Sequence, residues 1–257
     1  MGEIIKPIYK NRKIIIKDKS YIIKEIAFND SLSGIGKFFA ETKKEKAMFF
    51  EDSDNNYEGV YIYQDKDNPN IGYRIYQEFA NPGFNGYEDD KLVAKLQERQ
   101  SIITKSKFPT GIITLNGKIV GQQIPLFLNH SEIHEYCKTN TDKLPTASYK
   151  QVLDILKELY DNGIFYLDGH SKNFVVDRNS GHVEIIDFEF DKIEFDTVIS
   201  TSNWKIFSNL NGLINRCNEN SRVSDILKQC KVKSFDEAYE YVEEAEHNLI
   251  KSGRYCK

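Results

Sequence analysis

The sequence predicts an α+β fold with two lobes, a β-rich lobe followed by a mostly helical and smaller one. Three observations predict it. Strand-like runs of Ile, Val and Tyr fill much of the first 127 residues, one amphipathic helix interrupts them at 88–104, and helical patterns dominate residues 128–257. A chain of 257 residues can form two lobes, and we place the cleft between them near residues 126–130.

The first lobe contains three predicted β-hairpins. Ile-rich runs on both sides of "KDKS" predict the first within residues 1–50, a β-rich extension of uncertain role. The second joins "EGVYIYQ" to "IGYRIYQEFA" through "DKDNPN", whose Asp, Asn and Pro favour a turn. The third, at 111–125, turns at Asn116-Gly117, the strongest short hairpin signal in the chain. Between the first two, "GKFFAETKKEKAMFFEDSD" fits either a strand or a helix, and both alternatives stay open.

Five segments of the chain have helical patterns. The helix at 88–104 begins with acidic residues and ends with Lys, as the helix dipole favours. The stretch "SEIHEYC" predicts a short helix with a Ser cap. The helix at 147–161 has Leu and Ile residues on one face and ends at Asn162-Gly163. Near the C-terminus, "VSDILKQC" and "SFDEAYEYVEEAEHNLIKS" predict helices as well.

Composition restricts the partners and the compartment. The net charge of −4 argues against nucleic-acid binding, which usually requires a basic surplus. No apolar stretch approaches the roughly 18 residues of a membrane span, and the first residues lack the apolar core of a signal peptide. The four cysteines have no metal-ligand spacing and are expected to be reduced thiols. We therefore predict a cytoplasmic protein without nucleic-acid or membrane partners.

The stretch "YLDGHSKNFVVDRNSGHVEIIDFE", at 166–189, gathers polar residues around a predicted hairpin. Asp168 and Asn173 share one loop, and Asp187 follows the returning strand. Because the two ends of a hairpin meet at its open end, Asp187 is expected near Asn173. Carboxylate and amide oxygens bind Mg²⁺, and a separate carboxylate can orient an acceptor hydroxyl. The alternative is a polar surface hairpin without a site.

The spacing Asp168-x4-Asn173, followed by "IDF" at 186–188, resembles the catalytic loop and metal-binding motif of the protein kinase-like superfamily. The helix at 147–161 matches the helix that supports that loop, and the strand pair at 111–125 matches the strands that lead into the hinge. The resemblance implies a two-lobed kinase-like fold that uses ATP and Mg²⁺.

The resemblance also implies roles for residues of the loop. Asp168 would align the acceptor hydroxyl and take its proton, and Asn173 and Asp187 would bind Mg²⁺. His170 would hydrogen-bond the transferred phosphoryl group or hold the loop, and Lys172 is an alternative source of positive charge.

The same resemblance places nucleotide-binding residues in the first lobe. Arg74 lies where the family has its strand Lys, and Glu98 matches the ion-pair Glu of the helix that follows. Lys24 and Lys46 are the alternatives to Arg74. Gly59 would belong to the phosphate-binding loop, for which "SGIGKFF" is the rival.

The hinge would span Leu126 to His130, with Pro125 and Phe127 beside the nucleotide.

Departures from the family pattern leave the acceptor open. The usual His-Arg before the catalytic Asp is Tyr166-Leu167, His170 follows the Asp-x-His-x-x-Asn pattern of aminoglycoside and choline kinases, and Glu189 replaces a Gly. About 70 residues remain after Asp187, which implies a reduced second lobe. We interpret the chain as an ATP-dependent phosphotransferase that acts on protein Ser or Thr hydroxyls. The alternatives are a small-molecule kinase and a pseudokinase that serves as a binding or scaffolding module.

Overall fold

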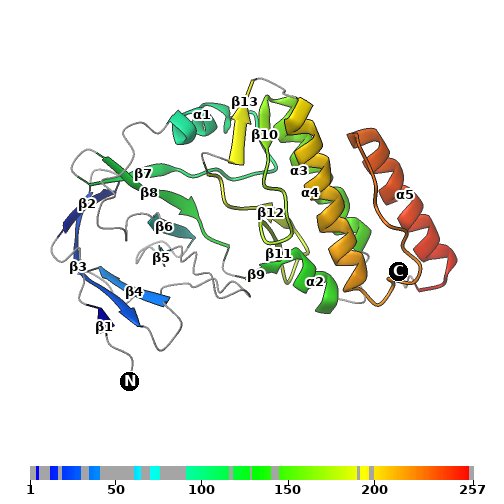
Figure 1. Cartoon of the computed structure of the whole chain (residues 1–257), viewed down its shortest axis with the longest axis horizontal. Helices are drawn as coiled ribbons and strands as arrows, with labels where there is room; N and C mark the ends of the chain where they lie inside the picture. The colour runs from blue at the N-terminus through cyan, green and yellow to red at the C-terminus, as the bar shows by residue number, and fades with distance from the viewer. Residues whose placement is uncertain are drawn as a thin grey trace. The chain divides into compact units, whose positions relative to one another are not determined.

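The computed structural model of the chain (Figure 1) describes residues 4–5, 12–16, 19–29, 35–40, 61–64, 70–75, 91–115, 118–127, 129–139, 145–189, 192–196 and 200–254. Strands and helices are both abundant in these ranges. The chain divides into two compact units, one of residues 1–98 with 108–128 and one of residues 99–107 with 129–257. The segment 99–107 therefore belongs with the second unit, although the sequence had placed it in the first lobe.

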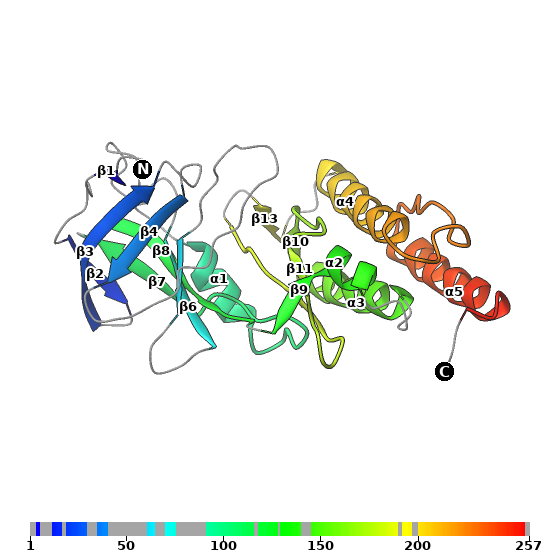
Figure 2. The ribbon, with the colours of Figure 1, turned by 90° about the horizontal axis from the view of Figure 1, so that it is seen from below.

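Unit 1 contains an antiparallel sheet of eight strands (Figure 2). The strands are β1 (Ile4–Ile5), β2 (Arg12–Ile16), β3 (Lys19–Asn29), β4 (Ile35–Ala40), β5 (Tyr61–Gln64), β6 (Ile71–Ile75), β7 (Gly111–Leu115) and β8 (Lys118–Pro125). Their order is β1-β3-β2-β7-β8-β6-β5, and β4 pairs with β3. Since β2 pairs with β7, strands of the first 50 residues continue the sheet that the later hairpins form.

All three predicted hairpins are confirmed. β2 pairs with β3, β5 with β6 and β7 with β8, each in antiparallel register. In the stretch that fitted either a strand or a helix, residues 36–40 belong to β4, while 41–54 lie outside the described residues. Arg74 of β6 is the register partner of Gln122 in β8, and both side chains are buried.

Helix α1 (Lys91–Arg99) is shorter than the predicted helix at 88–104. Its first predicted turn lies outside the described residues, but the predicted C-terminal end is wrong. The chain turns after Arg99, and Ile103 becomes buried. Both carboxylate oxygens of Glu158 accept the N–H of Thr104 at 3.1 Å, and one of them accepts that of Lys105 at 2.8 Å. The N–H groups of Thr104 and Lys105 are therefore bonded without a helix, and α1 ends before them without leaving these donors unpaired.

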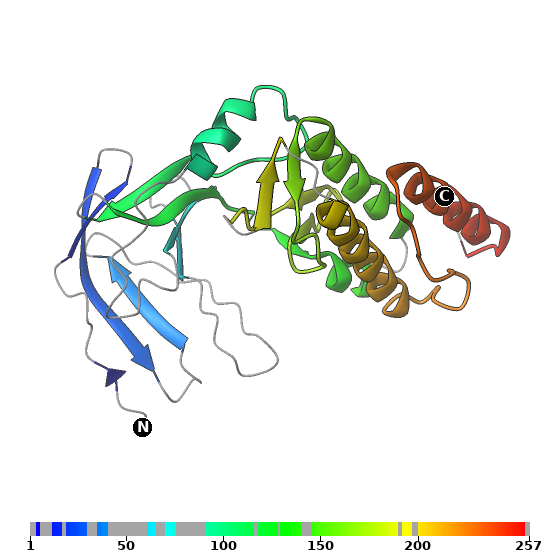
Figure 3. The same cartoon turned by 45° about the horizontal axis from the view of Figure 1, so that its top comes forward.

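Four helices form most of unit 2 (Figure 3). They are α2 (Ile133–Thr139), α3 (Pro145–Asp161), α4 (Ser200–Glu219) and α5 (Phe235–Lys251). α3 packs against both α5 and α4 through the apolar face that its sequence predicted. Val152, Ile155, Leu156 and Leu159 are all buried there. Burial of such side chains contributes about 1.5–3 kcal/mol each, which makes α3 the core of the unit.

The ends of two helices follow from their sequences. α3 ends at Asn162-Gly163 as predicted, with Gly163 at a φ of 70° and its N–H donating to Tyr160 O. Only a residue without Cβ adopts this conformation at little cost. α5 begins after Ser234, whose side chain accepts the N–H of Glu237, while the Glu237 carboxylate accepts the N–H of Lys233. These bonds satisfy donors that the first helical turn leaves free.

The predicted helix in "VSDILKQC", at 223–230, is wrong. Residues 223–226 of this stretch form turns, and 228–230 belong to no helix or strand. Asn215 of α4 donates to Cys230 O and accepts from Cys230 N, and Asn211 bonds Val232 in the same way. The backbone groups that a helix would use internally are bonded to α4 instead, so tertiary contacts override the local helical preference.

Two small antiparallel sheets complete unit 2. One pairs β10 (Ile164–Tyr166) with β13 (Ile193–Phe195), and the other has the order β12 (Val183–Ile185), β11 (Phe174–Asp177), β9 (His130–Glu132). β11 and β12 are the predicted polar hairpin. β9 includes the first two residues of "SEIHEYC", so α2 begins two residues later than its predicted Ser cap. Within the described ranges, the helices are too short or too polar to span a bilayer.

Candidate functional site

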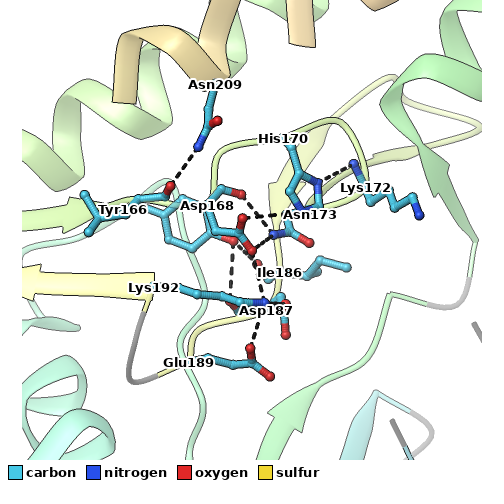
Figure 4. Close-up of polar contacts among 11 residues, drawn as sticks. Tyr166, Asp168, His170, Lys172, Asn173, Ile186, Asp187, Glu189, Lys192 and Asn209 are labelled. Carbon is cyan, nitrogen blue, oxygen red and sulfur yellow. Dashed lines mark hydrogen bonds and ion pairs between the residues drawn. The ribbon is translucent and has the colours of Figure 1, made fainter. Parts of the chain in front are cut away.

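The loop after β10 brings Asp168 and Asn173 together (Figure 4). The side-chain amide of Asn173 donates to both the backbone O and the Oδ2 of Asp168, each at 2.9 Å. Two backbone bonds tighten the loop: His170 N donates to Asp168 O at 2.7 Å, and Asn173 N donates to His170 O at 3.0 Å. The amide N–H groups of Asn173 therefore face Asp168. The amide oxygen of Asn173, its Oδ1, is left as the atom suited to bind a cation.

The hairpin returns Asp187 to this loop, as the sequence predicted. Ile186 N donates to Asn173 O at 2.9 Å, and Tyr166 Oη donates to Ile186 O at 2.8 Å. Asp187 has a φ of 68°, in the left-handed region that residues with a Cβ seldom adopt. Asp and Asn adopt this region more readily than other residues with a Cβ, and Asp196 has a φ of 59° as well.

Lys192 lies between the acidic side chains, and sequence reasoning did not select it (Figure 4). Its Nζ is 3.0 Å from Asp168 Oδ2, 2.8 Å from Asp187 Oδ2 and 2.7 Å from Glu189 Oε2. Burial alone would lower the pKa of Lys192, but hydrogen bonds and charges from Asp187 and Glu189 outweigh it and raise the pKa above its usual value. The ammonium group is therefore charged throughout the physiological range.

The cluster of Asp168, Asp187, Glu189 and Lys192, here called the acidic cluster, carries excess negative charge. Three carboxylates share the ammonium group of Lys192, so the formal charges of these four side chains sum to −2. The four side chains are only partly buried, with about a fifth to a quarter of each exposed. A divalent cation would balance this charge.

The donor set fits Mg²⁺, which prefers oxygen ligands and keeps several waters. Asp187 and Asn173 offer carboxylate and amide oxygens, and the ammonium of Lys192 already acts as a cation among the carboxylates. Within the ranges that the structure describes, no three His, Cys, Asp or Glu side chains are arranged to hold a metal ion by themselves. A metal here would need ligands from water or substrate, as Mg²⁺ in phosphate chemistry usually does.

Side chains of α3 and α4 hold the loop and the hairpin in place through hydrogen bonds. Asn209 of α4 donates to Leu167 O at 2.7 Å. Gln151 of α3 donates to Gly181 O and accepts from Val183 N, both at 3.0 Å, which ties the hairpin to the helix. The rings of Tyr166 and Phe188 pack edge to face with centroids 5.6 Å apart. Neither Gln151 nor Asn209 has a local sequence signal, since each acts on a residue far away in the chain.

The structure places His170 at the loop but separates Lys172 from the carboxylates. His170 Nε2 is 3.5 Å from Asp168 Oδ1, and its Nδ1 accepts the backbone N–H of Lys172 at 3.2 Å. The side chain of Lys172 is exposed. His170 therefore contacts the predicted catalytic Asp, whereas the cation that reaches it is Lys192.

The predicted nucleotide-binding residues of unit 1 do not form one described cluster. Arg74 is buried on β6, whereas Glu98 is exposed near the end of α1, and no ion pair joins these two described residues. Pro125 ends β8, and Phe127 follows it half-buried. Gly59 lies outside the described residues.

The alternatives to Arg74 and to the loop with Gly59 lie on strands or outside the described residues. Lys46 lies outside the described residues, and Lys24 lies on β3. In "SGIGKFF", the residues from Ile35 onward form the strand β4.

No protein-family model and no curated protein matches this sequence. Among solved structures, the chain is similar to the crystal structure of the Mycobacterium tuberculosis PknI kinase domain. The match has a TM-score of 0.45 and 10% sequence identity, and it covers 79% of this chain and 96% of that chain.

Proposed function

We propose that the chain is an ATP- and Mg²⁺-dependent phosphotransferase that transfers phosphate to a hydroxyl group. One observation carries the proposal: Asp168, Asn173 and Asp187 meet at the open end of one hairpin, with excess negative charge and a left-handed Asp187. A site that holds a divalent cation beside a carboxylate base needs carboxylate and amide oxygens gathered in this way.

Each residue has a separate task in this proposal. Asp168, fixed by the amide of Asn173, orients the acceptor hydroxyl and accepts its proton. Asn173 Oδ1 and the Asp187 carboxylate hold Mg²⁺, which would neutralise negative charge on the phosphate groups. His170 lies close enough to Asp168 to influence its orientation or to contact the phosphoryl group.

Nucleotide binding is proposed for residues of unit 1, namely Arg74, Glu98, Gly59, Pro125 and Phe127.

The acceptor is proposed to be a protein Ser or Thr hydroxyl. Between His130 and Asp168 the described residues form β9, α2, α3 and β10, with no additional helical segment to enclose a small acceptor. A small-molecule acceptor is the second candidate. It is favoured by His170 next to Asp168 and by Glu189 in the acidic cluster, the two positions where the loop follows the small-molecule kinase pattern.

The decisive experiment measures ATP binding by thermal shift with and without Mg²⁺. A ligand at about 100 times its Kd stabilises the folded state by about 2.7 kcal/mol, which raises Tm by several degrees. We expect this shift for the wild-type protein with Mg²⁺ and its loss in Asp187→Ala. The matched control is Asp161→Ala, which removes an exposed carboxylate from the end of α3. An undiminished shift in Asp187→Ala would contradict the metal assignment.

Labelled ATP then identifies the acceptor class. The purified protein is incubated with [γ-³²P]ATP, alone and with a cell lysate. Label on protein bands supports the protein acceptor, and label confined to small molecules supports the second candidate. ATP binding without any transfer would mean that the chain is a pseudokinase.

A further inference from the structure

The backbone of Lys192 is attached to both loops of the site. Its carbonyl O accepts the N–H of Leu167 at 2.7 Å, one residue before Asp168. Its own N–H donates to Glu189 O at 3.2 Å, in the segment that follows Asp187. These bonds fix the Cα of Lys192 relative to the acidic residues, while the flexible four-carbon side chain leaves the ammonium group free to move.

The ammonium group makes the contacts that a small cation would make. An ammonium has three N–H donors, and the Lys192 Nζ has one oxygen from each of Asp168, Asp187 and Glu189 within 3.0 Å. Without this charge, the three carboxylates would repel one another more strongly. Two of the three are the proposed base and the proposed metal ligand, so the ammonium binds the same oxygens that the reaction requires.

We propose that Lys192 is a displaceable counter-ion: its ammonium group holds Asp168 and Asp187 in place in the metal-free protein and gives way when a divalent cation binds. The proposal rests on the proposed function for its purpose, because it assigns the residue that organises that site before metal arrives. The charges of the cluster agree with this exchange, since three carboxylates, one ammonium group and one divalent cation sum to zero. The displaced ammonium stays tethered at the site, near the negative charge that a nucleotide brings.

The test is metal affinity in the absence of nucleotide. Mn²⁺ has the same preference for oxygen ligands as Mg²⁺ and is detected directly by electron paramagnetic resonance. Removal of a competing unit charge within a few ångströms should tighten binding, and we expect Lys192→Met to lower the Kd for Mn²⁺ by about tenfold or more. Lys192→Arg keeps the charge, so its Kd should stay within about threefold of the wild-type value.

The charge-matched control is Lys157→Met, which removes an exposed Lys that pairs with Asp161 on α3. We expect it to leave the Mn²⁺ affinity unchanged. An unchanged or weaker affinity in Lys192→Met would overturn the proposal, because the metal would then not compete with the ammonium group. Equal tightening in Lys157→Met would also overturn it, since the effect would follow net charge alone.

A second measurement guards against misfolding of the single variant. Lys192→Met removes the ammonium group that the three carboxylates share, so its Tm without metal should fall and Mn²⁺ should restore more of it than in the wild type. If Lys192→Met does not fold, the comparison is made in a Glu189→Gln background, where fewer carboxylates repel one another. The Mn²⁺ affinity of Glu189→Gln is then compared with that of Glu189→Gln/Lys192→Met. Tightening on loss of Lys192 is expected in that pair as well, and its absence would overturn the proposal.

A measurement of phosphate transfer distinguishes failure of this proposal from failure of the proposed function on which it rests. Tighter Mn²⁺ binding in Lys192→Met, together with no transfer from ATP by the wild type, would support the counter-ion and overturn the phosphotransferase. Transfer by the wild type, together with unchanged Mn²⁺ affinity in Lys192→Met, would support the phosphotransferase and overturn the counter-ion.

Discussion

Unit 2 contains two groups of polar side chains that are satisfied in different ways. One is the acidic cluster at the end of the hairpin. The other is a row of asparagines on α4, here called the asparagine row and made up of Asn211, Asn215 and Asn218. Both groups link segments that are distant in the chain, yet only one of them has the properties of a reactive site.

The asparagine row is neutral and its hydrogen bonds are complete. Asn211 and Asn215 each use the amide N–H to donate to a backbone carbonyl and the amide O to accept a backbone N–H, at distances of 2.6–3.0 Å. Asn218 accepts from Tyr149 Oη and donates to Tyr241 Oη, both at 2.7 Å. Complete pairing of buried polar groups stabilises one fold and leaves no group available for a ligand.

The acidic cluster has the opposite properties. It is partly exposed, its four side chains carry more negative than positive charge, and Asp187 has a left-handed backbone. Such features cost stability and persist only where the surrounding structure enforces them. The comparison teaches that a complete polar network marks a structural role in this protein, whereas unbalanced charge among partly exposed side chains marks the candidate site. The predictions that follow test this distinction.

The largest expected effect is on transfer by Asp168→Asn. The substitution preserves shape but removes the carboxylate that accepts the hydroxyl proton, so the rate should fall by about 10²–10⁴-fold. ATP binding and Tm should stay close to wild type, because the proposed metal ligands remain. Rates come from single-turnover transfer and binding from thermal shift. Near-wild-type transfer would remove Asp168 from the mechanism.

Asn218→Ala should show the reverse pattern. It leaves the hydroxyl of the fully buried Tyr149 without its acceptor, and the free energy of unfolding should fall by about 1–3 kcal/mol. Denaturant unfolding measures this, and transfer per folded molecule should be unchanged. Asn220→Ala, which removes an exposed side chain at the end of the same helix, is the control and should change stability by about 0.5 kcal/mol or less. A larger loss of transfer than of stability would mean that the asparagine row belongs to the site.

Three substitutions at Asp187 measure the backbone strain. Asn and Gly tolerate a φ of 68° better than Ala does, so Asp187→Ala should be less stable than Asp187→Asn and Asp187→Gly by about 1 kcal/mol. All three should lose metal-dependent nucleotide binding. Equal stabilities, measured by denaturant unfolding, would show that the left-handed conformation is not maintained in solution.

The sequence predicted the elements whose signals are local. The three hairpins of unit 1 have turn residues or strand runs in the chain itself, and α3 has both its apolar face and its terminal Asn162-Gly163. The errors arise where distant residues decide. Glu158 bonds the backbone that follows α1, and Asn215 and Asn211 bond the backbone at Cys230 and Val232, although helices were predicted up to residue 104 and over 223–230.

The candidate site was predictable to the same degree. A hairpin necessarily brings Asn173 and Asp187 together, so their convergence followed from spacing. Lys192 was not selected, because a Lys five residues after an Asp predicts no contact by its spacing. Only the pairing of β10 with β13 places Lys192 beside Asp168. The signal was present only as "DFEFDK", an acidic run that ends in one cation.

The smallest expected effect concerns Asp177, an acidic residue whose bonds resemble those of the asparagine row. Its Oδ1 accepts the N–H groups of Ser180 and Asn179 and the Ser180 hydroxyl, which close the turn between β11 and β12. These bonds, first of all that from the Ser180 backbone, lower the pKa of Asp177 from 3.8 to about 2. Because the folded-state pKa is depressed, the stabilisation is complete above the unfolded-state value of about 3.9 and is lost as pH falls through about 2.

The pKa of Asp177 can be measured by NMR titration of its carboxyl carbon, and we expect a midpoint near pH 2. Ser180→Ala removes the hydroxyl bond but keeps the backbone bonds, so the midpoint should rise only part of the way towards the usual Asp value. A wild-type midpoint at the usual value would mean that the turn does not form as described. Asp177→Asn should then lower Tm slightly without changing transfer, because a carboxylate satisfied by its own turn serves the fold, whereas one held against two others serves the site.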